Sequence, residues 1–222
     1  MSDGPEASLD PKDPLDKVRR VLALARTGLH FAGPQYRSDG NGEFDRERYA
    51  EIVALASQWL AEHTAAPATA LLAAWHADDG YVTPKVDVRG AVFRDDKILL
   101  VRERSDGRWT LPGGWADVNE TPSQAVEKEI EQESGYTAQA VKLAAVYDRR
   151  AHNAPRSIFY IYKLFFICEL TGGAPRVSNE TDGVEFFALD ALPELSTGRT
   201  AKWQIERMYA HYRDRVLAAD FD

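Results

Sequence analysis

The segment IFYIYKLFFICEL, residues 158–170, constrains the fold more than any other part of this 222-residue chain. Successive side chains of a β-strand point to opposite faces of the sheet. Both alternating sets are apolar from Ile158 to Cys168, and Lys163 is the exception. Such a strand is typical of the interior of a sheet that is covered on both sides. We therefore expect a strand within residues 157–170, with helices on both faces of its sheet.

Shorter β-rich runs surround this strand. VDVRGAVF (86–93) and KILLVRE (97–103) flank the dipeptide Asp95-Asp96, which is a signal for a β-hairpin. Further strands are expected near residues 141–147 and 184–189, and a helix over residues 200–218. This order of strands and helices predicts an α+β fold, an α/β/α sandwich with a mixed sheet.

Residues 1–80 have a helical pattern instead. Apolar residues recur at helical spacing over residues 13–27, where Asp13 is the expected N-cap and Pro14 the first helical residue. A second helix is expected over residues 44–63, after a polar loop at 37–43, and a short third one over 68–75. The sequence thus predicts a small all-α domain at 1–80 and a second domain at 81–222.

The apolar faces of these N-terminal helices are too rich for two or three helices to bury among themselves. We expect the helical domain to pack on the second domain or on another subunit, and a homodimer is the simplest arrangement.

The composition excludes several classes of partner. A formal net charge of -8 disfavours sequence-independent binding to nucleic acid or to an anionic membrane, because both need clustered Lys and Arg. No window reaches the roughly 18 apolar residues of a membrane span. The single cysteine, Cys168, lies in the apolar strand and has no partner for an intrachain disulfide. We expect a cytoplasmic protein without a membrane segment, and nucleic acid is an unlikely partner.

Residues 112–136, PGGWADVNETPSQAVEKEIEQESGY, form a glycine loop that continues into a helix. Thr121 is the expected N-cap, Pro122 the first helical residue and Gln124 the partner in a capping box. Gly135 is the expected C-terminal stop.

Two carboxylates of this helix fall on its apolar face. At 100° per residue, Glu129 and Glu133 are about 40° apart and share a side with Val126 and Ile130. Inward carboxylates cost several kcal/mol in desolvation and repulsion unless a cation compensates them. A hard divalent metal held by oxygens is one solution, and an ion pair with Arg or Lys from a neighbouring strand is the other. Helix geometry alone leaves both open.

Glu127 and Glu131 fall on the opposite side of the helix. A solvated like-charge pair at this spacing costs only tenths of a kcal/mol. We expect both side chains on the surface.

The whole stretch resembles the Nudix box, GX5EX7REUXEEXGU, in which U is a bulky apolar residue. The residues in register are Gly114, Glu120, Glu129, Ile130, Glu133, Gly135 and Tyr136. The resemblance implies a Nudix-type fold and a Mg²⁺-dependent pyrophosphohydrolase, with Mn²⁺ as an alternative ion. Such an enzyme cleaves the diphosphate bridge of a nucleoside diphosphate derivative into a nucleoside monophosphate and a phosphorylated product.

The resemblance also implies roles for particular residues. It assigns metal binding to Glu129 and Glu133, and we include Gln132 and Gly114 in the metal site. The base that accepts the proton of the attacking water is expected among Glu120, Glu129 and Glu180, the last because related enzymes often draw a catalytic glutamate from a late loop such as SNETDG.

Two residues depart from the box. Lys128 stands where the family has Arg, so it retains the charge but loses the planar fork that orients a carboxylate at two points. Gln132 stands where the family has the first Glu of the terminal pair. An amide oxygen can coordinate a metal but brings no negative charge, so metal affinity should fall.

Resemblance to a bacterial Nudix subgroup with a helical N-terminal extension covers most of the chain. It includes TPKVDVRG, WTLPGGWADV, AAVYDRR, YKLFF, SNET and LPELSTGR. Members of this subgroup resemble CDP-choline and ADP-ribose pyrophosphatases. Arg149, Tyr147 and Arg89 are the expected substrate-binding residues, whereas His152 is expected on the surface rather than at a metal.

Two alternatives to an active hydrolase stay open. Gln132 is compatible with a catalytically weakened Nudix-fold module that binds nucleotides without turnover. Some relatives process RNA ends, an activity that the acidic net charge makes less favourable. The sequence does not specify the group beyond the diphosphate, the number of metal ions or the identity of the base.

Overall fold

The computed structural model describes residues 14–33, 42–64, 66–76, 81–152 and 159–222. They divide into two compact units, one within Leu9–Thr83 and the other over Pro84–Asp222. Each unit is described by itself.

The first unit is helical and consists of α1 (Pro14–Phe31), α2 (Gly42–His63) and α3 (Ala68–His76). Helix α1 runs beyond the expected end near residue 27. Within it, Gly28 lies against the ring of Tyr49, and the absence of a side chain there lets α1 and α2 approach closely. The expected cap Asp13 and most of the expected loop at 37–43 lie outside the described residues. The buried side chains of this unit include Leu15, Leu22, Ala25, Val53, Leu60, Leu71 and Trp75.

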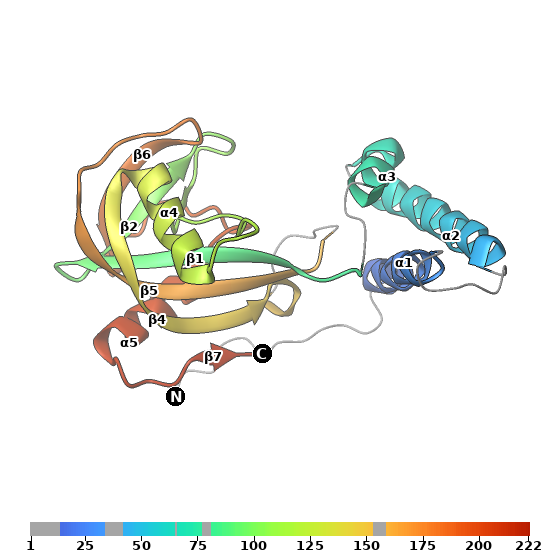
Figure 1. Ribbon diagram of the computed structural model, residues 1–222. Coiled ribbons are helices and arrows are strands. Elements are labelled where there is room, and N and C mark those ends of the chain that lie inside the picture. The colour runs from blue at the N-terminus through green and yellow to red at the C-terminus, as the bar shows by residue number, and fades with distance from the viewer. Residues whose placement is uncertain (1–13, 34–41, 65, 77–80, 153–158) are drawn as a thin grey trace. The chain divides into compact units, whose positions relative to one another are not determined.

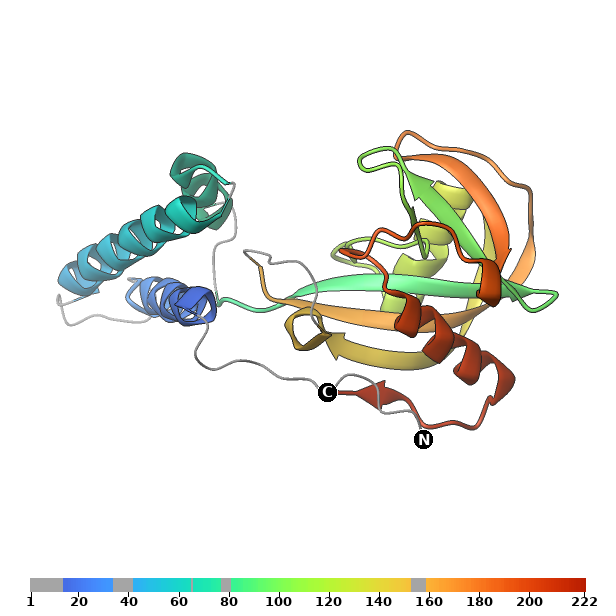
Figure 2. The same ribbon diagram turned by 180° about the vertical axis from the view of Figure 1, so that it is seen from behind.

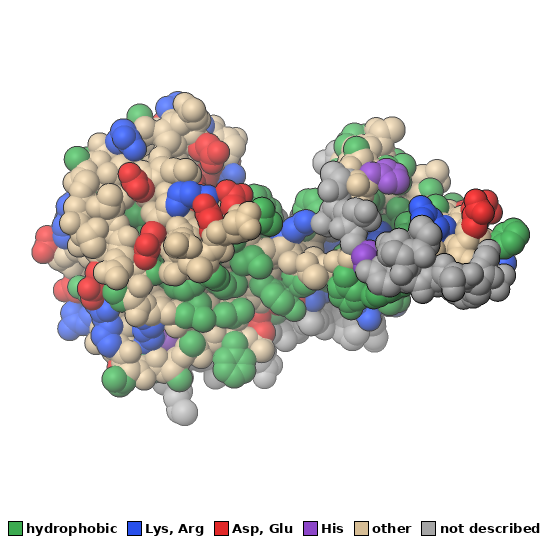
Figure 3. All heavy atoms as spheres, in the orientation of Figure 1, with side chains coloured by type: hydrophobic (Ala, Val, Ile, Leu, Met, Phe, Trp, Pro, Cys, Tyr) green, Lys and Arg blue, Asp and Glu red, His purple; other side chains and the backbone are tan. Residues whose placement is uncertain are grey.

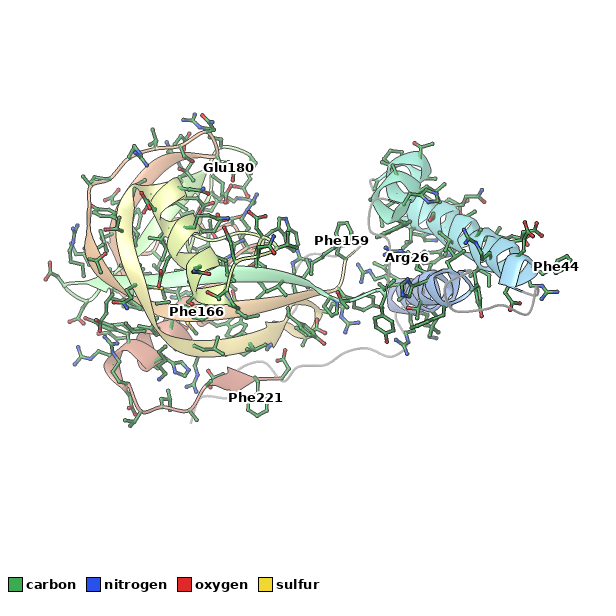
Figure 4. All side chains as sticks on the ribbon, in the orientation of Figure 1. Arg26, Phe44, Phe159, Phe166, Glu180 and Phe221 are labelled. Carbon is green, nitrogen blue, oxygen red and sulfur yellow. The ribbon has the colours of Figure 1, made fainter. Side chains whose placement is uncertain are left out.

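Large apolar side chains remain on the surface of these helices. Leu24 is 54% exposed, Leu55 58% and Phe44, near the start of α2, 63% (Figure 4). Val21 and Phe31 are exposed as well. The helical unit therefore has apolar surface that its own core does not cover.

The second unit is built on one mixed seven-stranded sheet (Figure 1). Its strands follow the order β3-β2-β1-β5-β4-β7, and β6 pairs with β2. Strands β1 and β5 are parallel, whereas β1 with β2 and β4 with β5 are antiparallel. The strands are β1 (Lys85–Arg94), β2 (Lys97–Glu103), β3 (Trp109–Thr110), β4 (Tyr136–Asp148), β5 (Ile161–Gly173), β6 (Thr181–Ala188) and β7 (Asp220–Phe221). The expected α+β sandwich with a mixed sheet is confirmed.

Strand β5 lies between β1 and β4 and is buried on both faces along its middle, as its sequence predicts. Phe165 and Ile167 enter the core cluster beneath α5 (Lys202–Arg213), and Phe166 and Cys168 enter the cluster beneath α4 (Pro122–Ser134). The two helices cover opposite faces of the sheet (Figures 1 and 2).

The β1–β2 hairpin closes at the predicted dipeptide. Asp95 and Asp96 have φ angles of 52° and 58°, and Arg94 pairs with Lys97 across the turn. Two consecutive residues with positive φ are the requirement of a type I′ turn, which matches the twist of the strands.

Several boundaries differ from the expectation. The last helix ends at Arg213 rather than near 218, where Asp214 closes it with an N–H bond to the Ala210 carbonyl. The chain then returns as β7 beside β4, and β4 itself begins at Tyr136 rather than near 141. Strands β3 and β7 have two residues each, too few for an alternating pattern to be recognised. The first two residues of the expected strand at 157–170 lie outside the described residues.

Among the residues that the structure describes, no helix is both long and apolar enough to cross a membrane.

Helix α4 packs on β1 at Gly90, and this contact allows a test of the fold. A Cβ atom at Gly90 would lie 2.6 Å from Cδ1 of Ile130 and 3.1 Å from Cγ2 of Val126. Gly90→Ala is therefore expected to destabilise the protein by about 1–3 kcal/mol, the usual cost of overpacking. Urea unfolding followed by circular dichroism measures it.

The matched control is Gly172→Ala on the same sheet, where the nearest atom would be Oγ1 of the half-buried Thr137 at 3.2 Å. Its effect should be much smaller. Equal stabilities for the two variants would contradict the α4–β1 packing.

Candidate active site

The glycine loop before α4 lies along β1 as an additional strand-like segment. The Val88 amide donates to the Gly114 carbonyl at 2.8 Å, and the Gly90 amide donates to the Pro112 carbonyl at 2.9 Å. Gly113 has φ of +143°, and a Cβ atom there would lie 2.0 Å from the Val88 carbonyl oxygen. Only glycine fits this position, so the double glycine fixes the loop against the sheet.

Helix α4 begins and ends as its sequence predicts. Thr121 is the N-cap, its hydroxyl accepts from the Gln124 amide, and the Gln124 side chain accepts from the Thr121 amide. Pro122 is the first helical residue, and Gly135 closes the helix with φ of 76°. These signals set the helix register and thereby the direction of each carboxylate.

Glu129 and Glu133 point from α4 into the glycine loop. The Glu133 side chain is buried, and its Oε2 accepts from the Gly113 amide at 2.9 Å. The carboxylate of Glu129 lies so close to Gly114 that a Cβ atom there would be 3.2 Å from its Oε2. The loop and the two carboxylates are thus one packed assembly.

Burial controls the ionisation of these carboxylates. Desolvation raises the pKa of Glu133 to about 8, although Arg89 and the Gly113 amide act in the opposite direction. Desolvation also raises the pKa of Glu129 against the influence of Lys128 and Arg89. The protein by itself therefore disfavours the charged forms, and an added cation would stabilise them.

A structural ion pair does not provide this compensation. Neither Glu129 nor Glu133 forms an ion pair with a Lys or Arg of the described segments. Arg89, the cation that acts most strongly on Glu133, is bound to Asp87 through two hydrogen bonds of 2.9 and 2.8 Å. Of the two solutions that the sequence left open, the geometry favours an added cation.

A cavity of about 890 Å³ opens beside α4 and collects most of the expected site residues. Figure 3 shows acidic and basic side chains gathered together on the surface over α4 and the loop before it, and Glu180 lies near α4 in Figure 4. The expected site residues that line the cavity are Arg89, Gly114, Glu129, Gln132, Glu133, Arg149 and Glu180.

Glu120 lies outside the cavity lining and contacts Lys128. The ammonium group of Lys128 donates to Glu120 Oε1 and to Asp117 Oδ2, both at 2.8 Å. Lys128 thereby ties the loop before α4 to the helix through two separate carboxylates, where the family's Arg can grip one carboxylate at two points.

Tyr147 also lies outside the main cavity. Its hydroxyl donates to Asp220 Oδ2 at 3.1 Å, and its ring packs against His152 and Trp203. Tyr147 lines a smaller cavity of about 20 Å³, which shares Arg149 with the main one. The expectation that His152 lies on the surface is wrong: its side chain is only 10% exposed and pairs with Asp222 at 2.6 Å, so its contacts are those of a structural residue.

Glu127 is not the solvated side chain that the helical wheel suggests. Its Oε1 accepts from the Ala140 amide at 2.8 Å and connects α4 to β4. The pairing of β4 with β5 is irregular directly after Ala140. A wheel of a single helix cannot show such a contact with a strand. Glu131 is exposed as expected.

Six charged residues of the cavity were missed as site residues: Asp87, Glu103, Asp117, Lys163, Arg176 and Arg199. Asp87, Glu103 and Lys163 are buried. Glu103 is paired with Arg199 Nε at 3.1 Å, and burial raises the pKa of its carboxyl. The sequence did contain a signal for such residues, namely a charged side chain on the inward face of an otherwise apolar strand. In KILLVRE this residue is Glu103, at the end of β2.

The site fits a hard divalent ion that keeps part of its water shell. Among the described residues no three acidic, His or Cys side chains converge closely enough to form a complete site. Mg²⁺ commonly takes one or two carboxylates and completes its six ligands with water and substrate phosphate oxygens. The Gly114 carbonyl accepts from Val88 and has a second lone pair, and the exposed side chain of Gln132 lines the same cavity.

Comparison with known proteins agrees with this geometry. Residues 83–209 match the NUDIX domain, and residues 12–75 match the UDP-X-like, N-terminal oligomerisation domain. The chain belongs to the Nudix hydrolase family, in the form that has a helical N-terminal region.

One relative covers nearly the whole chain, and a second covers about half of it. YjhB of Bacillus subtilis (strain 168) is 38% identical over 208 residues, which are 94% of this chain and 96% of YjhB. The ADP-ribose pyrophosphatase of Methanocaldococcus jannaschii is 33% identical over 119 residues, 52% of this chain and 69% of that protein.

Two solved structures are similar as well. The crystal structure of a UDP-X diphosphatase has a TM-score of 0.60 at 31% identity, covering 94% of this chain and 97% of its own. An ADP-ribose pyrophosphatase from Streptococcus suis has a TM-score of 0.59 at 39% identity, covering 63% of this chain and all of its own.

Proposed function

We propose that this protein is a Mg²⁺-dependent pyrophosphohydrolase, with Mn²⁺ as an alternative ion, that cleaves the diphosphate bridge of nucleoside diphosphate derivatives. The products are a nucleoside monophosphate and a phosphorylated second group. The observation that carries the proposal is the pair of inward carboxylates, Glu129 and Glu133, packed under Gly113 and Gly114 at the wall of a large cavity.

In this proposal Glu129 and Glu133 hold the metal, and the Gln132 amide oxygen and the Gly114 carbonyl contribute directly or through water. When bound, the ion offsets the negative charge of the diphosphate and stabilises the leaving phosphate. Because Gln132 brings no charge, the affinity for metal should be lower than in a site with three carboxylates.

Glu180 is our first candidate for the base that accepts the proton of the attacking water. Its side chain is exposed and lines the cavity, and its charge acts on both Glu129 and Glu103. Glu129 is the second candidate. Glu120 is the third, and its contact with Lys128 favours a role in positioning the loop.

Arg149 is the proposed substrate contact among the expected cations, because it lines the cavity. Arg89 is buried and held by Asp87, so we assign it a positioning role. Tyr147 borders the smaller cavity next to Arg149 and would act on the substrate through that residue.

The names of the relatives direct the choice of substrate. ADP-ribose and UDP-linked compounds are our first candidates, since proteins named for them share this fold and, in the UDP-X diphosphatase, nearly the full chain length. CDP-choline is a further candidate from the resemblance of the sequence.

A binding module without turnover is the second candidate function, and Gln132 is the observation that favours it. RNA processing has no comparable support, because the net charge is -8.

Release of products from a panel of diphosphates tests the proposal. We expect ADP-ribose, UDP-glucose or CDP-choline to yield a nucleoside monophosphate only when Mg²⁺ or Mn²⁺ is present. Glu133→Gln should lower kcat/KM by more than about a hundredfold, since loss of a ligand exceeds the effect of losing its supporting contacts. Chromatography of the products measures both.

Glu131→Gln is the matched control, because Glu131 is on the same helix and exposed. It should keep normal activity. Folded wild-type protein that binds these compounds without cleaving them at high metal concentration would replace the hydrolase by the binding module.

We also propose that the protein is a homodimer in the cytoplasm and that its helical unit forms the contact. The exposed Leu24 and Leu55 and the match to an oligomerisation domain support the dimer. The location rests on the acidic composition and the single cysteine.

Leu24→Glu tests the interface. The substitution places a charge in a contact that is apolar and buried in the dimer, so we expect the dimer to become a monomer. Light scattering coupled to size exclusion measures the molar mass. Glu131→Gln, at an exposed position of α4 outside the helical unit, is the control and should remain dimeric. A wild-type mass equal to one chain, 24.8 kDa, would contradict the dimer.

A further inference from the structure

Lys163 has an ionisable side chain at a buried strand position that is normally apolar. It lies on the same face of β5 as Ile161, Phe165 and Ile167, and its side chain is 4% exposed. Its Cα partner on the parallel strand β1 is Asp87. An ammonium group in such a place costs several kcal/mol of desolvation unless it is fully paired.

The available counter-charge is already engaged. Asp87 lies 3.7 Å from the Lys163 ammonium, too far for a hydrogen bond, whereas both of its oxygens accept from Arg89 at 2.9 and 2.8 Å. Arg89, Lys163 and Arg149 are three cations around one acid in this part of the cavity. The packing of the strand thus does not explain why Lys163 is charged.

The ammonium group of Lys163 has more N–H donors than its contacts within the protein use. One of its three N–H groups donates to the Arg199 carbonyl. Even with a second directed toward Asp87, a third remains for the cavity, which Lys163 lines together with Arg149. The smaller cavity beside Tyr147 is lined by Lys163 as well, so the residue stands where the two spaces meet.

We propose that Lys163 is a specificity-determining residue whose ammonium group donates a hydrogen bond to an oxygen of the substrate, away from the carboxylates of α4. This inference rests on the proposed function and deepens it. The substrate oxygen belongs either to the nucleoside or to the group beyond the diphosphate.

Electrostatics agree with this role. Burial lowers the pKa of Lys163 to about 7, Asp87 opposes the change, and Arg89 and Arg149 add to it. A hydrogen bond to an oxygen acceptor of the substrate would stabilise the charged form of Lys163, which burial and the two arginines disfavour.

Lys163→Met separates binding from structure. If Lys163 serves the ligand, the Met variant should melt at the same temperature or higher, because a buried charge with incomplete pairing has been replaced by an apolar side chain of similar size. Its dissociation constant for the ligand should rise about tenfold to a hundredfold. A purely structural lysine would show the reverse, with lower stability and unchanged affinity.

The ligands are AMP and ribose 5-phosphate, titrated by calorimetry with Mg²⁺ present. Neither contains a diphosphate bridge, so the measurement is independent of whether the protein proves to be a hydrolase. Weaker binding of AMP alone assigns the contact to the nucleoside, and weaker binding of ribose 5-phosphate alone assigns it to the other group. Either result supports the inference.

Two further variants complete the design. Lys163→Arg retains the donors and should recover part of the affinity. Lys142→Met removes a lysine of β4 that donates to the Asp214 carbonyl and does not line the cavity, and it should bind as the wild type does. UMP and CMP are titrated beside AMP, because UDP-linked compounds and CDP-choline are candidate substrates as well. Wild-type protein that binds none of these ligands, or dissociation constants that Lys163→Met leaves unchanged, would overturn the inference.

Discussion

The site depends on two carboxylates that one helix directs into the protein. The caps of α4 set its register, and its apolar residues Val126 and Ile130 bind it to β1. Once that register is fixed, Glu129 and Glu133 have to face the glycine loop. The fold thereby places charge where the protein disfavours it. In the proposed function a divalent cation is the compensation, and it also suits hydrolysis of a diphosphate.

The cavity is lined by both carboxylates and cations. Glu129 and Glu133 come from α4 and Glu103 from β2, whereas Arg89 and Lys163 come from β1 and β5. In the proposed function an anionic substrate bound through a metal uses the carboxylates of α4 for the reaction and can use the cations for recognition. Specificity for the group beyond the diphosphate would then depend on strand residues such as Lys163.

The sequence was most informative where a local rule has a strict physical basis. Alternation on both faces predicted the central strand, and capping residues predicted both ends of α4. Contacts between segments that are far apart in the sequence could not be predicted from it. The bond from Glu127 to β4 and the return of the chain as β7 depend on tertiary packing. Lys163 was visible as an exception in its strand, but only its approach to Asp87 and the cavity indicates a role.

Stability against urea between pH 5 and 7, with and without Mg²⁺, tests the central claim most directly. Burial raises the pKa of Glu133 from 4.5 to about 8, so the metal-free folded protein holds a proton that the unfolded chain releases. The stability of the protein should fall as pH rises across this window, and Glu133 contributes at most about 1.4 kcal/mol per pH unit to this fall. Mg²⁺ or Glu133→Gln should reduce the fall. The same slope in wild type and variant, unaffected by Mg²⁺, would contradict the account.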